Sequence, residues 1–194
     1  DKNIKTKEYL VQVAKENFVA FGSKHITMDE LAILLGISKK TIYTYFSTKE
    51  DLVVESIKKL VCEFNADIAP ILSSDKEALD KIIAVYEVAF DYISKFKPSF
   101  VFGLKKYYPE AYNTYKRATE KIVFTEVFLL LEEAKKKGRI RGNVNLILFS
   151  KLYLYELENR LFNTDRLFET YSKEELLEYM IINNLNSITV VKDN

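Results

Sequence analysis

The sequence predicts an all-α protein of about nine helices, and three observations support this prediction. Only three prolines and five glycines occur in 194 residues, so residues that break helices are scarce. Charged residues (29%) recur among hydrophobic ones (48%) with the spacing of amphipathic helices. At several points Ser or Thr precedes an acidic residue by three positions, which is the pattern of a helix-capping box.

The first two predicted helices are short and clearly delimited. The first covers about residues 4–21 and ends at Gly22, which can adopt the left-handed conformation of a helix end. Its apolar stripe consists of Leu10, Val13, Ala14, Phe18 and Phe21. Thr27 and Glu30 form a capping box at the start of the second helix, which Gly36 ends. Its inward side chains are expected to be Leu31, Leu34 and Leu35.

A third short helix follows almost at once, capped by Ser38 and ending near Tyr45. Two helices of about eight residues joined by a glycine-containing turn are the helix-turn-helix pattern. Ala32 is small enough for the two helices to pack closely, and Gly36 can adopt the positive φ of the corner. Residues 1–50 are therefore expected to form one compact three-helix domain.

Six further helices are predicted, and residues 51–194 are expected to form a second, helical domain. The predicted ranges are about Lys49–Leu72, Lys76–Phe96, a short helix from Pro98, Pro109–Lys137, Asn145–Phe162 and Lys173–Val190. Pro70 either kinks the end of the first of these helices or stops it at Ile68. Ser172 and Glu175 form a capping box before the last helix.

The residue counts argue against an enzyme, a metal site and a cofactor. His25 is the one histidine and Cys62 the one cysteine, so a two-histidine metal site and an internal disulfide are excluded within one chain. Cys62 lies in the apolar run IKKLVCEF and is expected to pack in the core. The sequence contains no glycine-rich phosphate loop and no G-x-S-x-G motif.

The sequence also favours a cytoplasmic protein. No run of about 18 apolar residues could span a membrane. The segment DKNIKTKEYL lacks the apolar run of a signal peptide, and a lone cysteine suits a reducing compartment.

The third predicted helix has an outward face without carboxylates. The charged residues from Leu31 to Lys49 are lysines alone, although the whole chain has 29 basic and 28 acidic residues. At 100° per residue, Ile42 and Phe46 point toward the core. The opposite face carries Lys40 and Thr44, with Thr41, Tyr43, Lys39 and Tyr45 at its flanks.

Such a face suits a phosphate-lined groove, because an acid there would be repelled by the phosphates. Helix N-termini at Thr27, Ser38 and Thr48 add backbone N–H groups suited to phosphate, and Lys49 can grip the DNA backbone beside the recognition helix. We interpret the face as a DNA-binding surface. The alternative is an ordinary solvated face of a short amphipathic helix.

Residues 7–55 resemble the tetracycline-repressor (TetR) family of bacterial transcription regulators. The segments VAKENFVAFG and ITMDELAILLGISKKTIYTYFSTKEDLV carry the resemblance. It implies DNA-contacting roles for Thr27, Lys39, Lys40, Thr41, Tyr43, Thr44, Tyr45 and Lys49. Tyr43 and Lys49 match phosphate-holding positions, and Lys40 stands where the family often has glycine.

The resemblance further implies a homodimer that binds a palindromic double-stranded DNA operator as a repressor. In this family the last two long helices of each chain form a four-helix bundle, which corresponds here to about residues 145–162 and 173–190. The run LILFSKLYLYELENRLF agrees, because it is apolar around more of its circumference than one buried face requires.

By the same resemblance, residues 51–194 would enclose a small-molecule site and dimerise. A small hydrophobic or aromatic effector would release the DNA. The candidate effector contacts are Tyr86, Phe90, Tyr107, Tyr112, Phe124, Phe128, Tyr153 and Glu156. Aromatic residues at helical spacing are also ordinary core residues, and Glu156 can pair with Arg160 on a helix surface. Two alternatives therefore remain: a DNA-binding protein of this fold without a small-molecule effector, and a helical ligand carrier.

Overall fold

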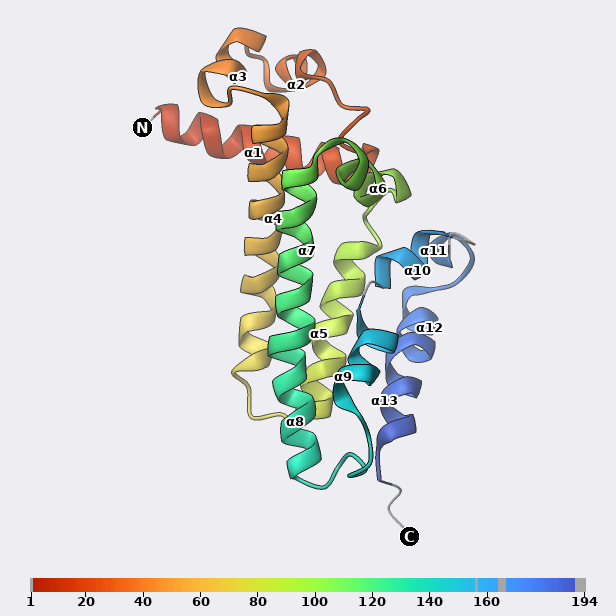
Figure 1. The fold of residues 1–194 in the computed structure, drawn as a ribbon. Coiled ribbons are helices and arrows are strands. Elements are labelled where there is room, and N and C mark those ends of the chain that lie inside the picture. Colours follow the sequence, from red (N-terminus) through yellow and green to blue (C-terminus); the bar gives the residue numbers. More distant parts are fainter. Residues whose placement is uncertain (1, 156, 164–166, 191–194) are drawn as a thin grey trace. The chain divides into compact units, whose positions relative to one another are not determined.

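The chain is helical along most of its length in the computed structural model, which confirms the all-α prediction (Figure 1). The structure describes residues 2–155, 157–163 and 167–190. Among these residues, extended backbone pairs at an isolated bridge between Ile140 and Thr189 and forms no strand. The α-helices are α1 (Lys2–Phe21), α2 (Met28–Leu35), α3 (Lys39–Tyr45), α4 (Lys49–Leu72), α5 (Ala78–Ile93), α6 (Pro98–Tyr107), α7 (Pro109–Lys121), α8 (Phe128–Lys136), α9 (Leu146–Phe149), α10 (Leu157–Asn163), α11 (Leu167–Thr170), α12 (Lys173–Leu177) and α13 (Asn183–Ile188). Three π-helical segments are η1 (Ile122–Val127), η2 (Ser150–Leu154) and η3 (Glu178–Ile182).

The helices pack into two compact units. The first contains Asp1–Glu63 and Lys95–Arg117, so it joins α1, α2, α3 and the start of α4 with α6 and the start of α7. The second contains Phe64–Ser94 and Ala118–Asn194. The division into a domain of residues 1–50 and one of residues 51–194 stays a prediction about function. In terms of packing, α6 belongs with the N-terminal helices.

The predicted caps position the short helices of the first unit. The Thr27 hydroxyl accepts from the Glu30 amide at 3.1 Å, and the Glu30 carboxylate accepts from the Thr27 amide at 2.7 Å. Ser38 caps α3 in the same way, with a 3.0 Å bond from the Thr41 amide. Gly36 has a φ of 63°, the left-handed value that the corner between α2 and α3 requires. The predicted helix-turn-helix is therefore present.

Three side chains that were predicted to be buried are exposed. Leu34 and Phe21 are both 56% exposed, whereas each was expected to face inward. In α2 the buried stripe runs through Met28, Leu31 and Ala32, because an eight-residue helix buries only one narrow face. The Cys62 side chain, expected in the core, is exposed on α4.

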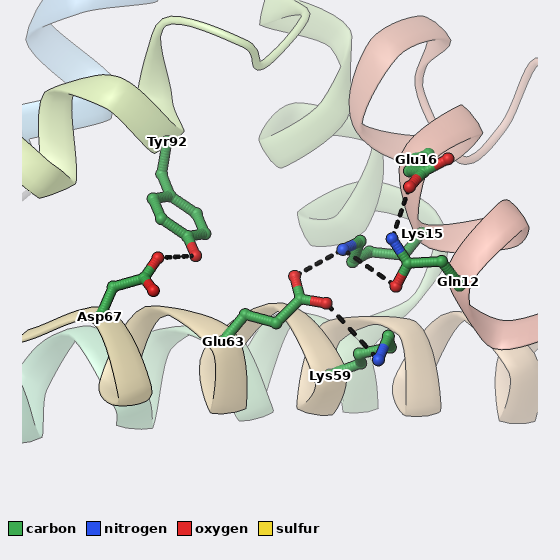
Figure 2. Close-up of polar contacts among 7 residues, drawn as sticks. All are labelled: Gln12, Lys15, Glu16, Lys59, Glu63, Asp67 and Tyr92. Carbon is green, nitrogen blue, oxygen red and sulfur yellow. Dashed lines mark hydrogen bonds and ion pairs between the residues drawn. The ribbon is translucent and has the colours of Figure 1, made fainter. Parts of the chain in front are cut away.

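The second unit is organised around α5, which packs against α8 and α12. Ile82 and Phe90 of α5 are fully buried. At the end of α5, the Tyr92 hydroxyl donates to Asp67 of α4 at 2.6 Å (Figure 2). The Tyr92 ring meets the Phe64 ring edge-on, with the centroids 5.3 Å apart. These contacts hold the last turns of α4 within the second unit.

Of the predicted long helices, α4 and α5 are continuous, whereas each of the last three contains a π-helical segment. The helix predicted over residues 145–162 is also interrupted at Tyr155, after which α10 follows. The run predicted from Pro109 to Lys137 is α7, η1 and α8 in sequence, and the last predicted helix is α12, η3 and α13. The predicted eighth helix is α9 and η2, after which Tyr155 adopts an extended conformation (φ −100°, ψ 149°). Helical periodicity does not distinguish these segments from α-helix, because segments of five or six residues are too short to show a repeat of their own.

One ion pair joins α1 to α4 inside the first unit. Lys15 is almost completely buried, and its Nζ lies 2.5 Å from the Glu63 carboxylate of α4 (Figure 2). Gln12 accepts a second bond from Lys15 at 3.4 Å, and Lys59 approaches the other Glu63 oxygen at 3.5 Å. A buried ammonium is costly without such partners. The pair therefore determines where α1 can pack along α4.

Removing the Glu63 carboxylate should destabilise the protein through the charge that it leaves behind. We expect Glu63→Ala to lower the free energy of unfolding by about 1–3 kcal/mol, because Lys15 remains buried with only Gln12 as a partner. Adding Lys15→Met should restore most of the loss, since methionine fills the volume of the lysine stem without a charge. Chemical denaturation measures both effects.

Glu55→Ala is the matched control, because Glu55 forms an exposed pair with Lys58 on the same helix. Exposed pairs contribute little to stability, so this variant should denature almost as the wild type does. Equal losses for Glu63→Ala and Glu55→Ala would show that the buried pair does not hold α1 on α4.

Candidate nucleic-acid interface

The outward face of α3 has the composition that the sequence predicts. Ile42 and Phe46 are buried, while Lys40 and Thr44 are exposed and Tyr43 is 43% exposed. The Thr44 hydroxyl donates to the Thr41 carbonyl at 2.6 Å, so it stays on the helix surface. Lys40 has no ion-pair partner among the residues that the structure describes. Its ammonium is thus available to an external anion.

The structure brings one carboxylate to the edge of this face. Lys39 donates to Asp29 of α2 at 2.8 Å, and this hydrogen bond raises the pKa of Lys39. Both side chains are largely exposed, so the pair is a surface interaction that a phosphate can replace. Thr41 and Tyr45 are only partly exposed. Asp29 lies outside the acid-free run of residues 31–49, so the sequence pattern did not indicate it. The packing of α2 on α3 brings its carboxylate to Lys39.

Lys49, at the start of α4, is held by aromatic rings. Its Nζ lies 5.6 Å from the centroid of the Tyr108 ring and 5.9 Å from that of Phe18. Burial lowers the pKa of Lys49, and the nearby Glu30 carboxylate opposes this shift. The Glu30 carboxylate is itself engaged at the α2 cap, and its pKa is lowered by hydrogen bonds from the Thr27 backbone and hydroxyl. The Glu30 carboxylate therefore lies near both Thr27, at the start of α2, and Lys49, at the start of α4.

The candidate effector residues do not all lie in the same unit. Tyr107 and Tyr112 belong to the first unit, and Tyr107 contacts Lys24 beside the helix-turn-helix. The second unit contains Tyr86, Phe90, Phe124, Phe128 and Tyr153. Glu156 lies outside the described residues.

Aromatic residues and a few polar groups line the interior of the second unit. The buried Tyr86 hydroxyl donates to the Leu154 carbonyl at 2.9 Å, and the Phe124 ring lies 5.2 Å from that of Tyr155. Tyr155 donates to Glu120 at 3.1 Å. The Ser150 hydroxyl is fully buried and has no hydrogen-bond partner among the described residues. A buried hydroxyl without a partner is uncommon, so this position can accept a further polar group.

Two other effector candidates lie nearer the surface. Phe128 lines an open groove of about 430 Å³ between α8 and α9, together with Glu132, Lys135, Lys136, Asn145, Leu146 and Ile147. Tyr153 is 37% exposed and packs on Phe149 with the ring centroids 5.2 Å apart. The structure therefore divides the predicted aromatic set into interior and surface members.

Two kinds of feature, a metal-binding cluster and a membrane-spanning helix, are absent from the described part of the chain. Among its residues, no three His, Cys, Asp or Glu side chains gather closely enough to share a metal ion. None of its helices combines the length and the apolar character needed to cross a membrane.

Comparison with known proteins agrees with this geometry. Residues 10–55, which span α2, α3 and most of α1, match the family model for bacterial regulatory proteins of the TetR family. The chain is 29% identical over 165 residues to the HTH-type transcriptional regulator YvaF of Bacillus subtilis (strain 168), covering 84% of this chain and 85% of YvaF.

Solved structures show the same fold at low sequence identity. A transcriptional regulator from Saccharomonospora viridis in complex with choline superposes with a TM-score of 0.82 at 14% identity, covering 96% of this chain and 99% of that one. The FadR regulator of Bacillus subtilis in complex with stearoyl-CoA gives 0.72 at 16% identity, covering 92% and 97%. These structures show the fold alone. With the helix-turn-helix geometry, the family match of residues 10–55 and the similarity to YvaF identify the chain as a transcriptional regulator of the TetR family.

Proposed function

We propose that the protein is a repressor that binds a palindromic operator as a homodimer and leaves it when a small hydrophobic ligand binds. The observation that carries the DNA-binding part is the outward face of α3. Lys40, Tyr43 and Thr44 are exposed there, and the helix itself has no carboxylate. Phosphates attract such a surface, while the threonine and lysine side chains can reach base edges.

The proposed contacts divide into two classes. Tyr43 and Lys49 are proposed to hold phosphates, which positions the protein without reading sequence. Lys39, Lys40, Thr41 and Thr44 are proposed to lie nearer the bases, with Thr27 and Tyr45 at the margins. Lys49 leaves its aromatic neighbours at little cost, because a cation–π contact is weaker than a desolvated ion pair with phosphate.

Selection of duplexes from a random library tests this division. The wild type should select a palindrome whose half-site centres are about 10 base pairs apart or a multiple of that distance. Lys49→Gln should weaken binding to all sequences alike and reduce the dependence of affinity on salt by about one phosphate contact. Lys40→Gln and Thr44→Ala should instead change the selected bases, by about 5- to 150-fold in preference at one position.

Lys58→Gln controls for loss of any positive charge, since Lys58 is exposed on α4 and paired with Glu55. Its selected sequence and salt dependence should match those of the wild type. If Lys49→Gln, Lys40→Gln and Thr44→Ala behave as Lys58→Gln does, α3 is not the recognition helix.

Exposed apolar side chains support the proposed dimer. In the α9–η2 segment, Ile147, Leu148 and Leu152 are 50–55% exposed, and Tyr179 of η3 is 74% exposed. These side chains lie on the two C-terminal helical runs for which a four-helix bundle is proposed. Apolar residues gathered in this way gain free energy when a second copy covers them.

A charge introduced on this surface should dissociate the dimer. We expect Leu148→Glu together with Leu152→Glu to shift the protein from dimer to monomer in sedimentation experiments, because each carboxylate would be buried in an apolar interface. Leu129→Glu is the control: Leu129 is equally exposed (57%) but lies on α8. A wild type that sediments as a monomer contradicts the proposed dimer.

The proposed effector site is the interior of the second unit. Its buried and half-buried aromatic side chains suit a mainly apolar ligand, and the Ser150 hydroxyl, which has no partner among the described residues, suits one polar group on it. Two proteins of the same fold were solved with choline and with stearoyl-CoA. We propose the acyl chain of the two because it matches a hydrophobic effector, although aromatic rings also attract a quaternary ammonium such as choline. Because α4 contributes to both compact units, a ligand-induced shift of this helix is the proposed link to the DNA-binding face.

Titration of the operator complex with stearoyl-CoA tests the effector. A coupling of about 1–3 kcal/mol would lower operator affinity about 5- to 150-fold at saturation. Phe124→Ala should reduce this response and leave operator affinity without ligand unchanged. Choline is the comparison ligand. If neither compound changes operator affinity, a DNA-binding protein without a small-molecule effector is favoured. A wild type that binds ligand but no DNA would instead be a ligand carrier.

A further inference from the structure

A second acid-free segment lies in the first unit, outside the helix-turn-helix. Between Asp91 and Glu110 the sequence has four lysines, Lys95, Lys97, Lys105 and Lys106, and no carboxylate. Residues 95–109 of this segment pack in the same compact unit as α2 and α3. It thus repeats, over α6 and the residues just before it, the charge pattern of the proposed DNA-binding face of α3.

The end of α6 meets the loop between α1 and α2. Lys24 of that loop donates to the Tyr107 hydroxyl at 2.9 Å, and its Nζ lies 4.4 Å from the Tyr107 ring centroid. Lys106 lies 5.4 Å from the same ring and 5.8 Å from the ring of Phe102. We name Lys24, Lys106 and Tyr107 the basic shoulder.

The lysines of the basic shoulder are oriented by rings instead of carboxylates. Elsewhere in the unit, Lys15, Lys58 and Lys59 pair with glutamates. Lys24 and Lys106 have no ion pair among the described residues, and both are exposed. An aromatic ring holds an ammonium in place without cancelling its charge. The shoulder therefore presents two positioned, uncompensated cations, and the Lys24 hydrogen bond lowers the pKa of Tyr107.

The basic shoulder is continuous with the proposed DNA-binding surface. Lys24 precedes the α2 cap, Thr27, by three residues. Tyr108, the neighbour of Tyr107, contacts the Lys49 ammonium at 5.6 Å, and the Glu110 amide donates to Glu50 at 3.4 Å. The end of α6 thus contacts the start of α4 and the loop that leads into α2.

We propose that the basic shoulder binds the phosphate backbone of DNA flanking the operator half-site, as a contact separate from the helix-turn-helix. This inference rests on the proposed DNA-binding function. Charge complementarity favours a polyanion, and continuity with Thr27 and Lys49 favours the duplex already bound by α3. Since backbone contacts carry no sequence information, the shoulder adds affinity without adding specificity.

Duplexes of two lengths test the proposal. One carries the operator alone, and the other adds about ten base pairs of arbitrary sequence on each side, about one helical turn. Wild-type protein should bind the longer duplex several-fold more tightly. Lys24→Gln with Lys106→Gln should lose this gain and flatten the salt dependence by about two phosphate contacts on the long duplex. Binding to the short duplex should be unchanged.

Tyr107→Phe and Lys58→Gln complete the design. Tyr107→Phe keeps the ring but removes the hydroxyl that Lys24 contacts, so it should lose part of the gain. Lys58→Gln should keep all of it. Equal affinity of the wild type for both duplexes overturns the proposal, as does a double variant that keeps the full gain. In that second case an acidic protein is the remaining candidate for this surface. A wild type that binds neither duplex refutes the proposed function itself.

Discussion

The Lys15–Glu63 ion pair joins α1 to α4 within the first unit. Leu10, Ala14 and Phe18 of α1 are almost completely buried, and Lys15 on the neighbouring side of the helix is neutralised by Glu63. A buried ammonium restricts the packing more than apolar contacts do, because sliding α1 by one turn would leave Lys15 unpaired in the interior. The start of α4 carries Lys49, and α1 leads into α2 and α3. The ion pair therefore limits how α3 can be placed relative to Lys49 within this unit.

The lysines of the first unit illustrate how environment assigns different roles to one residue type. Lys15 is buried and paired, and it serves the fold. Lys49 and Lys24 rest on aromatic rings, and neither they nor Lys40 form an ion pair among the described residues. Lys39 is intermediate, because its pair with Asp29 is exposed and replaceable. Net charge, which is only +1 for the whole chain, conceals this division.

In the second unit, unlike the helix-turn-helix, the sequence pattern does not distinguish core residues from ligand-binding residues. Its aromatic residues follow helical periodicity, and the same pattern is produced by a core and by a ligand site. Tyr86 and Tyr155 satisfy their hydroxyls with Leu154 and Glu120, which is the behaviour of core residues. Ser150 does not, and it lies at the start of π-helical η2. Irregular helices and unpaired buried hydroxyls are where a small ligand most easily replaces internal contacts.

The sequence by itself determined the helix-turn-helix, because its signals are local: the caps at Thr27 and Ser38, the left-handed turn at Gly36 and the apolar positions Ile42 and Phe46. Only the tertiary structure decided which side chains from different helices meet. Asp29 beside Lys39, Tyr107 beside Lys24 and Glu63 beside Lys15 are separated by 10, 83 and 48 positions, and no periodic pattern links such pairs. Pairing across elements depends on the packing of whole helices, which is a collective property of the core.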